Sequence, residues 1–310
     1  MEMEKEMSYI FETENLCKYY GKFKAVDGLN MSIPKGSIYG FVGKNGAGKT
    51  TLMRMLCGLQ KPTSGSYKLF DTKFDDKNIN QKRKKMGAVV ETPAIFGDLS
   101  ARDNLKLQCM NVGISDKNKI DEVLSLVGLT DVGRKKAKKF SLGMRQRLGI
   151  AMSLIVEPEF LILDEPINGL DPQGISEIRE LIYKLNKERG ITILISSHIL
   201  DELAKLATYY GFIDNGRIIK EMSATELEKS CRKNIRMKVE STKILSEIMK
   251  KRNIEYKIID DHVADVFSDL KFSEIADDFI KAGCDIISME EHEESLEAFF
   301  LSLVGGQNDD

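Results

Sequence analysis

The sequence predicts an α/β fold built on a mostly parallel sheet, with a small α+β module in its C-terminal part. Apolar runs at residues 38–42, 160–163 and 191–196 have the length and composition of buried strands. Helical patterns lie between them, at residues 143–156 and 173–189. Buried strands that alternate with helices are typical of a parallel sheet covered on both faces.

The bulk composition favours a soluble globular protein that acts at membranes only through a partner. The chain has 310 residues, 30% charged and 42% hydrophobic, and a net charge of −2, so no basic field predicts nucleic-acid binding. Its longest mostly apolar stretch, residues 148–156, is too short to span a bilayer. Residues 1–8 are acidic and lack the apolar centre of a signal peptide. Five cysteines without paired spacing predict reduced thiols in the cytoplasm.

The remaining parts of the larger domain have weaker patterns. Residues 10–42 predict short strands, and residues 50–59 and 101–128 predict helices. Residues 71–85 are charged and predict a solvated loop or helix surface.

A change of pattern near Glu221 predicts two domains, residues 1–221 and 222–310. The second has four short strand-like segments, two helical segments between them and a last helical segment. These segments are residues 235–240, 242–252, 256–259, 263–267, 272–282, 285–289 and 296–304. The resulting β-α-β-β-α-β order fits a small ferredoxin-like module.

A glycine-rich phosphate loop is predicted where the strand at residues 38–42 ends. The segment reads Gly43-Lys44-Asn45-Gly46-Ala47-Gly48-Lys49-Thr50, and Thr51 continues it into the predicted helix. Glycines let backbone N–H groups of the loop converge on phosphate oxygens, and the helix N-terminus adds a partial positive charge. We expect Lys49 to bridge the β- and γ-phosphates and the Thr50 hydroxyl to bind Mg²⁺. The alternative is a chance glycine turn, which the strand–loop–helix context disfavours.

Two carboxylates, Asp164 and Glu165, follow the apolar strand at residues 160–163. Ligands bind at the carboxyl edge of an open parallel sheet. We expect Asp164 to hold Mg²⁺ and Glu165 to accept a proton from the attacking water. An acidic strand end is weak evidence alone, and the upstream phosphate loop gives it weight.

With these motifs, residues 10–220 resemble the ATP-binding-cassette family. Further motifs occur in the family's order: Tyr20; the signature-like Phe140-Ser141-Leu142-Gly143-Met144-Arg145-Gln146-Arg147; Gly169-Leu170-Asp171; and Ser197-His198. The resemblance implies a P-loop cassette ATPase, with an antiparallel β subdomain and a helical subdomain beside the parallel sheet. It also implies ATP as the cofactor.

The resemblance assigns roles to these positions. Ser141 and Gly143 of one subunit would complete the ATP site of a second copy, and Asp171 would pair across that head-to-tail dimer. His198 would contact the γ-phosphate, although a buried structural histidine is the alternative. Tyr20 would stack on adenine, although a lone tyrosine is more often a packing residue.

Two departures from the family pattern point to one branch. Leu142 and Met144 replace the usual glycine and glutamine of the signature, and Glu91 stands where the family has a glutamine that binds Mg²⁺. We expect the Glu91 carboxylate to bind Mg²⁺, but it only accepts hydrogen bonds and would repel the γ-phosphate, so Glu91 bears on hydrolysis more than on ATP binding. At both departures the sequence resembles the branch that includes bacitracin-resistance and lantibiotic-immunity exporters. In that branch the ATPase subunits serve separate permeases.

The resemblance therefore implies an exporter subunit at the cytoplasmic face of the membrane. It places Ile95 and Phe96 near the permease contact, and local burial of these two side chains is the alternative. Two alternatives stay open. One is a soluble cassette ATPase acting on ribosomes or DNA, and the other is a regulatory module that hydrolyses ATP weakly. The sequence does not name the exported molecule.

Overall fold

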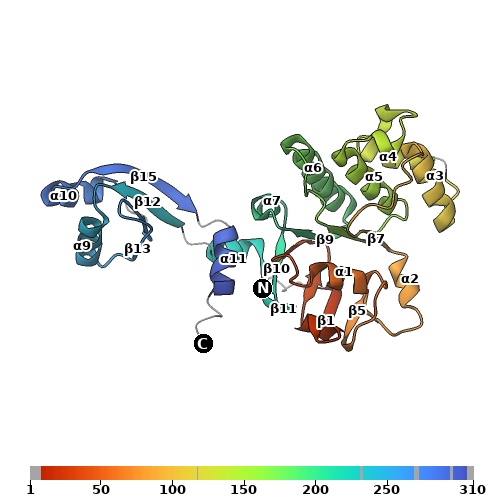
Figure 1. Cartoon of the computed structure of the whole chain (residues 1–310), viewed down its shortest axis with the longest axis horizontal. Helices are drawn as coiled ribbons and strands as arrows, with labels where there is room; N and C mark the ends of the chain where they lie inside the picture. Colours follow the sequence, from red (N-terminus) through yellow and green to blue (C-terminus); the bar gives the residue numbers. More distant parts are fainter. Residues whose placement is uncertain (1–7, 117, 231–232, 269–271, 294–295, 306–310) are drawn as a thin grey trace, which may run out of the picture. The chain divides into compact units, whose positions relative to one another are not determined.

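The computed structural model describes residues 8–116, 118–230, 233–268, 272–293 and 296–305. The chain divides into two compact units, Met1–Ala224 and Thr225–Asp310 (Figure 1). The domain boundary expected after residue 221 lies close to this division.

A six-stranded sheet forms the centre of the first unit, in the order β11-β10-β4-β9-β8-β7. Its strands are β4 (Ile38–Val42), β7 (Met86–Val89), β8 (Phe160–Asp164), β9 (Thr192–Ser197), β10 (Tyr209–Asp214) and β11 (Arg217–Ser223). All neighbours are parallel except β10 and β11. Every residue of β4, β8 and β9 is buried, which confirms the predicted covered parallel sheet.

A second, antiparallel sheet packs against the helix that follows the glycine-rich loop. Its strands are β1 (Tyr9–Tyr20), β2 (Phe23–Leu29), β3 (Ser32–Pro34), β5 (Ser64–Leu69) and β6 (Thr72–Lys73). The helix α1 (Lys49–Leu56) contributes Leu52, Met53 and Leu56 to a core shared with Phe11 of β1 and Phe160 of β8. Strands of both sheets therefore hold α1 in place, and Figure 1 shows α1 above β1 and β5.

A group of helices, α3 (Ala101–Val112), α4 (Asn118–Leu126) and α5 (Leu142–Leu154), forms the helical part of this unit, beside β7 (Figure 1). Residues 101–128, where the sequence pattern is helical, contain two helices, because Gly113 ends α3 with a left-handed φ of 76°. The other helices that begin in this unit are α2 (Ile79–Arg83), α6 (Pro172–Arg189), α7 (Leu200–Ala204) and α8 (Ala224–Ser230). Two short 3₁₀ turns, Thr130–Val132 and Ala137–Lys139, precede α5.

The second unit contains a four-stranded antiparallel sheet in the order β13-β14-β12-β15. Its elements are β12 (Lys233–Val239), α9 (Thr242–Arg252), β13 (Tyr256–Ile258), β14 (Val263–Val266), α10 (Phe272–Ala282), β15 (Ile286–Glu293) and α11 (Leu296–Gly305). Met237, Leu245, Val266 and Phe279 belong to its core. The element order is the β-α-β-β-α-β order expected of a ferredoxin-like module.

Within the described residues, none of the helices combines the length and the apolar character that crossing a membrane requires. Cys17, Cys57, Cys109 and Cys284 are free thiols, and Cys231 lies outside the described residues.

Asn104 fixes the segment that leads from the loop after β7 into α3. Its buried side-chain amide accepts a hydrogen bond from Phe96 N at 2.8 Å and donates to Phe96 O at 3.1 Å and Ser100 O at 2.9 Å. We expect Asn104→Ala to lower the free energy of unfolding by about 1–3 kcal/mol, because buried polar groups lose their partners. Chemical denaturation measures this loss. Asn111→Ala, at an exposed position of the same helix, is the control, and an equal loss in both variants would contradict the assignment.

Candidate functional site

Parallel pairing brings three strand ends to one edge of the central sheet. In the β8–β9 pair, Asp164 lies opposite Ser196, and in the β4–β9 pair Val42 lies opposite Ser197. The glycine-rich loop follows β4, Glu165 follows β8 and His198 follows β9. Residues from three distant segments therefore meet where open parallel sheets bind ligands.

The glycine-rich loop has the backbone freedom that an anion cradle needs. Gly46 has a φ of 84°, and a Cβ built there would meet no atom within 4 Å. Gly48 has a φ of 108°, and its Cβ would lie 2.3 Å from the carbonyl oxygen of Ala25. Gly48 also begins α1 and has no side chain that could cap the N–H groups of the first turn. Such a helix start suits a phosphate group.

The Lys49 side chain lies inside the loop and is only 6% exposed. It donates hydrogen bonds to the carbonyl oxygens of Gly43 at 2.5 Å and Lys44 at 3.2 Å, and it lies 3.9 Å from a Glu165 oxygen. Burial lowers the pKa of Lys49, and the nearby carboxylates of Glu165 and Asp164 oppose that shift. A bound anion would give the Lys49 ammonium group a full negative charge as its partner, whereas carbonyl oxygens carry only partial negative charges.

Asp164 is the centre of a hydrogen-bonded set of hydroxyl groups. Thr50 Oγ1 donates to Asp164 Oδ2 at 2.9 Å, and Ser196 Oγ donates to Asp164 Oδ1 at 2.6 Å. Ser196 Oγ also accepts from the N–H of Glu165 at 2.9 Å. One buried serine thus orients both carboxylate-bearing residues at the end of β8.

The carboxylate of Glu165 lies between Lys49 and His198. Its Oε2 lies 2.6 Å from His198 Nδ1, while its Oε1 faces Lys49. Glu165 has a left-handed φ of 50°, a conformation that costs a residue with a side chain about 1 kcal/mol or more. Strain of this kind, held by the neighbouring hydrogen bonds, is frequent at functional sites.

The three predicted metal ligands line one cavity of about 590 Å³, together with Glu165. Thr50 and Asp164 offer hard oxygen atoms, the donors that Mg²⁺ prefers, while the carboxylate of Glu91 is paired with Arg54. The described residues contain no group of three or more His, Cys, Asp or Glu side chains placed to hold a metal by themselves. Phosphate oxygens and water would therefore complete the coordination, as is usual for Mg²⁺.

The signature-like segment begins a helix. Ser141 caps α5, and its Oγ accepts from Met144 N at 3.2 Å. A Cβ at Gly143 would lie 3.7 Å from Leu170, so this segment adjoins the loop that ends at Asp171. Asp171 caps α6, accepting from Gly174 N at 3.1 Å. Ser141 and Asp171 are both exposed, and neither contributes to the hydrogen bonds around Asp164.

Tyr20 lies at the end of β1, and its side chain is 45% exposed. Its hydroxyl group hydrogen-bonds to Gln60, and the Lys18 ammonium lies 5.3 Å from its ring centroid. The residue is therefore not a core packing residue, which was the alternative to an adenine contact.

Comparison with known proteins identifies the family. The model of the family described as ABC transporter matches residues 26–168. The bacitracin transport ATP-binding protein BcrA of Bacillus licheniformis is 45% identical over 97% of this chain and 99% of its own length. The chain belongs to the ABC transporter family. It is an ATP-binding and ATP-hydrolysing subunit of that family, which confirms the predicted fold, the prediction of ATP as a cofactor and the enzymatic activity.

Two further proteins are similar to about two thirds of this ABC transporter subunit. The lantibiotic transport ATP-binding protein SrtF of Streptococcus pyogenes is 46% identical over 68% of this chain and 90% of its own. The solved dimeric structure of a bacterial ABC transporter cassette is 25% identical, with a TM-score of 0.63. It matches 69% of this chain and 98% of its own.

Ser196 and Arg54 are contributors to this site that the sequence motifs did not indicate. Ser196 was placed only within the strand at residues 191–196, and its signal was a hydroxyl group at the end of an otherwise apolar strand. Arg54 lies one helical turn after Thr50, which places it beside the loop that carries Glu91.

We expect Ser196→Ala to reduce MgATP hydrolysis by about ten-fold or more, because both Asp164 and Glu165 lose the hydroxyl group that orients them. Steady-state ATPase rates and thermal unfolding measure the two consequences. Ser197→Ala removes the neighbouring buried hydroxyl group, which bonds only to Ile199 backbone atoms. An equal loss of rate in both variants, with equal unfolding temperatures, would contradict the orienting role of Ser196.

Proposed function

We propose that this ATPase binds MgATP as a head-to-tail dimer and energises export through a separately encoded membrane permease. The observation that supports it most is the cluster at the strand ends, where Lys49, Thr50, Asp164, Glu165 and His198 lie within one network of close contacts. The cluster provides a cation for phosphate, oxygen ligands for Mg²⁺ and a base for water.

Lys49 would leave the carbonyl groups of the loop for the β- and γ-phosphates, because phosphate oxygens carry the charge that carbonyl oxygens lack. Backbone N–H groups from Gly43 to Thr51, including those of Asn45, Gly46, Ala47 and Gly48, would surround the phosphates. Thr50 and Asp164 would hold Mg²⁺, with Glu91 as a further ligand from the same cavity.

Glu165 would accept a proton from the attacking water, and His198 would stabilise the charge on the γ-phosphate. The geometry sets a condition on this second role. Because Nδ1 of His198 faces the carboxylate of Glu165, its proton is committed to that contact. Only the protonated imidazole then has a second N–H, at Nε2, to donate to phosphate.

The second copy would supply Ser141 and Gly143. Both lie at the exposed start of α5, where a hydroxyl group and an unobstructed backbone N–H can donate to a γ-phosphate. Each chain has one phosphate loop and one signature-like segment, so two sites complete each other only in a two-fold dimer. Asp171 would contact the mate, and the exposed ring of Tyr20 would stack on adenine.

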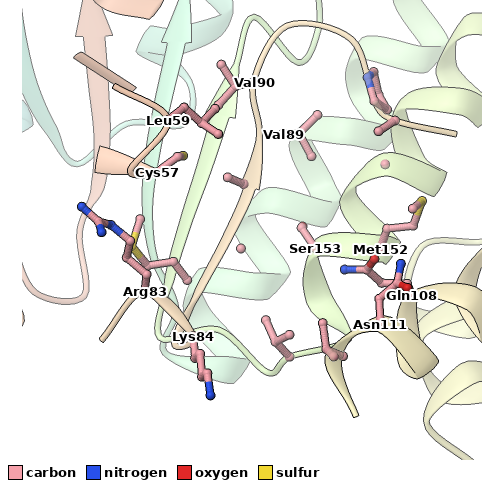
Figure 2. Close-up of a pocket in the computed structure, with 18 of the residues that line it drawn as sticks. Cys57, Leu59, Arg83, Lys84, Val89, Val90, Gln108, Asn111, Met152 and Ser153 are labelled. Carbon is pink, nitrogen blue, oxygen red and sulfur yellow. The ribbon is translucent and has the colours of Figure 1, made fainter. Parts of the chain in front are cut away.

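The permease contact is proposed at a groove of about 860 Å³ between the sheet and the helical part. Figure 2 shows Leu59 and Val90 on one side of this groove and Gln108, Asn111 and Met152 on the other. Its lining is largely apolar, and Leu59 is 70% exposed. An amphipathic helix of the permease would cover such a surface.

This groove shares lining residues with the cavity that contains Thr50, Asp164 and Glu165. Thr92 and Pro93 line both spaces, so a helix seated in the groove would contact the loop that carries Glu91. Phe96, which is 58% exposed, lies in the same loop. The chain would thereby be held at the cytoplasmic face of the membrane. The relatives named for bacitracin and lantibiotic transport support a peptide antibiotic as the exported molecule.

We expect Glu165→Gln to form a stable dimer with MgATP, because ATP binds but the base that activates water is lost. Size-exclusion chromatography with light scattering measures it. Lys49→Ala is the control and should bind no nucleotide and stay monomeric. A Glu165→Gln protein that remains monomeric at saturating MgATP, with and without its membrane partner, would contradict the dimer mechanism.

We expect Leu59→Asp to abolish co-purification of a polytopic membrane protein from the native host in mild detergent, because a charge in the groove opposes apolar contact. Tyr183→Asp, at an exposed position of α6 outside the groove, should leave recovery unchanged. Both variants should bind ATP as the unmodified protein does. Recovery of ribosomes or nucleic acid in place of a membrane protein would move the function to a soluble ATPase.

A further inference from the structure

Gly149 lies in the interior of α5, where glycine is disfavoured. A glycine within a helix costs about 0.5–1 kcal/mol relative to alanine, so its presence indicates a packing requirement. A Cβ at Gly149 would lie 2.5 Å from Cβ and 2.7 Å from Cγ of Pro93. The missing side chain therefore lets the Pro93 ring lie directly on the backbone of α5.

A second glycine extends this close contact. Gly87 lies in β7, and a Cβ there would lie 2.6 Å from the carbonyl oxygen and 3.1 Å from the Cβ of Ser153. Ser153 is one turn after Gly149 on α5. The backbone of α5 thus lies in close contact with both β7 and the loop that follows β7.

The same loop is attached at its other end to α1. Glu91, two residues before Pro93, forms an ion pair with Arg54, which lies one turn after Thr50. Glu91 has a left-handed φ of 62°, so the loop turns sharply between its two attachments. The segment from Glu91 to Pro93 is a short connection between the phosphate-loop helix and the helix that Ser141 begins.

We propose that Gly149 is a positioning residue that couples Glu91 to Ser141. By seating Pro93 on α5, it makes the helix follow the loop when the Glu91 carboxylate moves from Arg54 toward the bound nucleotide. α5 is continuous from Leu142 to Leu154, so a displacement at Gly149 reaches its capping residue Ser141, about 12 Å away along the helix. This inference rests on the proposed function, in which Ser141 completes the ATP site of the mate.

The contact also lies where the permease would act. Gly87, Pro93, Gly149 and Ser153 all line the groove of Figure 2, in which Ser153 is drawn on the helical side. A partner helix seated there would press on the same contact that joins Glu91 to α5. Gly149 therefore sits between the proposed permease surface and the dimer interface.

The test uses Glu165→Gln as the parent and adds Gly149→Ala. The added methyl group separates Pro93 from α5. We therefore expect the dissociation constant of the MgATP-dependent dimer to rise about ten-fold. ATP binding to the monomer should stay within about two-fold, because the phosphate loop is untouched. Analytical ultracentrifugation and a fluorescent ATP analogue measure the two constants.

A double-mutant cycle separates coupling from a structural effect. If Gly149 acts through Glu91, Gly149→Ala should weaken the dimer no further in a Glu91→Ala background. Additive losses, or an unchanged dimer in Gly149→Ala, would overturn the inference while the proposed function stands. A parent that does not dimerise would overturn both. Should Gly149→Ala not fold, Pro93→Ala, which removes ring atoms without adding bulk to α5, should weaken the dimer in the same direction.

Discussion

The parallel register of β8, β9 and β4 is the constraint on which the site depends. It sets Asp164 opposite Ser196 and Val42 opposite Ser197, so three loops leave the sheet at one edge. The burial of these strands on both faces makes the register costly to change, because a shift would move apolar side chains out of the core. Positions far apart in the chain thus lie together at one edge of the sheet.

Charge balance within the chain stabilises this edge. The Lys49 ammonium group is buried, yet carbonyl oxygens of the loop and the Glu165 carboxylate surround it. Glu91 is similarly paired with Arg54. Each charged group that would meet MgATP therefore already has a partner within the chain. In the proposed function MgATP would replace these partners, and Pro93, two residues after Glu91, packs against α5.

The fold was largely predictable because its signals are local: apolar runs gave β4, β8 and β9, and glycines marked the loop before α1. Other features depend on tertiary contacts that a single sequence does not reveal. The strands β10 and β11 were not anticipated, and neither was the pairing of Arg54 with Glu91, which joins a helix to a distant loop. Gly149 looked like an ordinary member of a helical pattern, and only the approach of Pro93 explains it. The roles of all the site residues stay predictions, and those of Ser141, Asp171 and Tyr20 depend on partners that belong to a nucleotide and a second chain.

The central claim is that each ATP lies between Lys49 of one chain and Ser141 of another. Mixing two defective proteins tests it, one with Lys49→Ala and one with Ser141→Arg, both in the Glu165→Gln background. If the site is shared, the mixed dimer has one intact site, formed by Lys49 of the second protein and Ser141 of the first. Neither protein alone should retain ATP after rapid desalting, whereas the mixture should retain it, as one ATP for each mixed dimer. A mixture that retains no more ATP than its separate components would contradict the shared site.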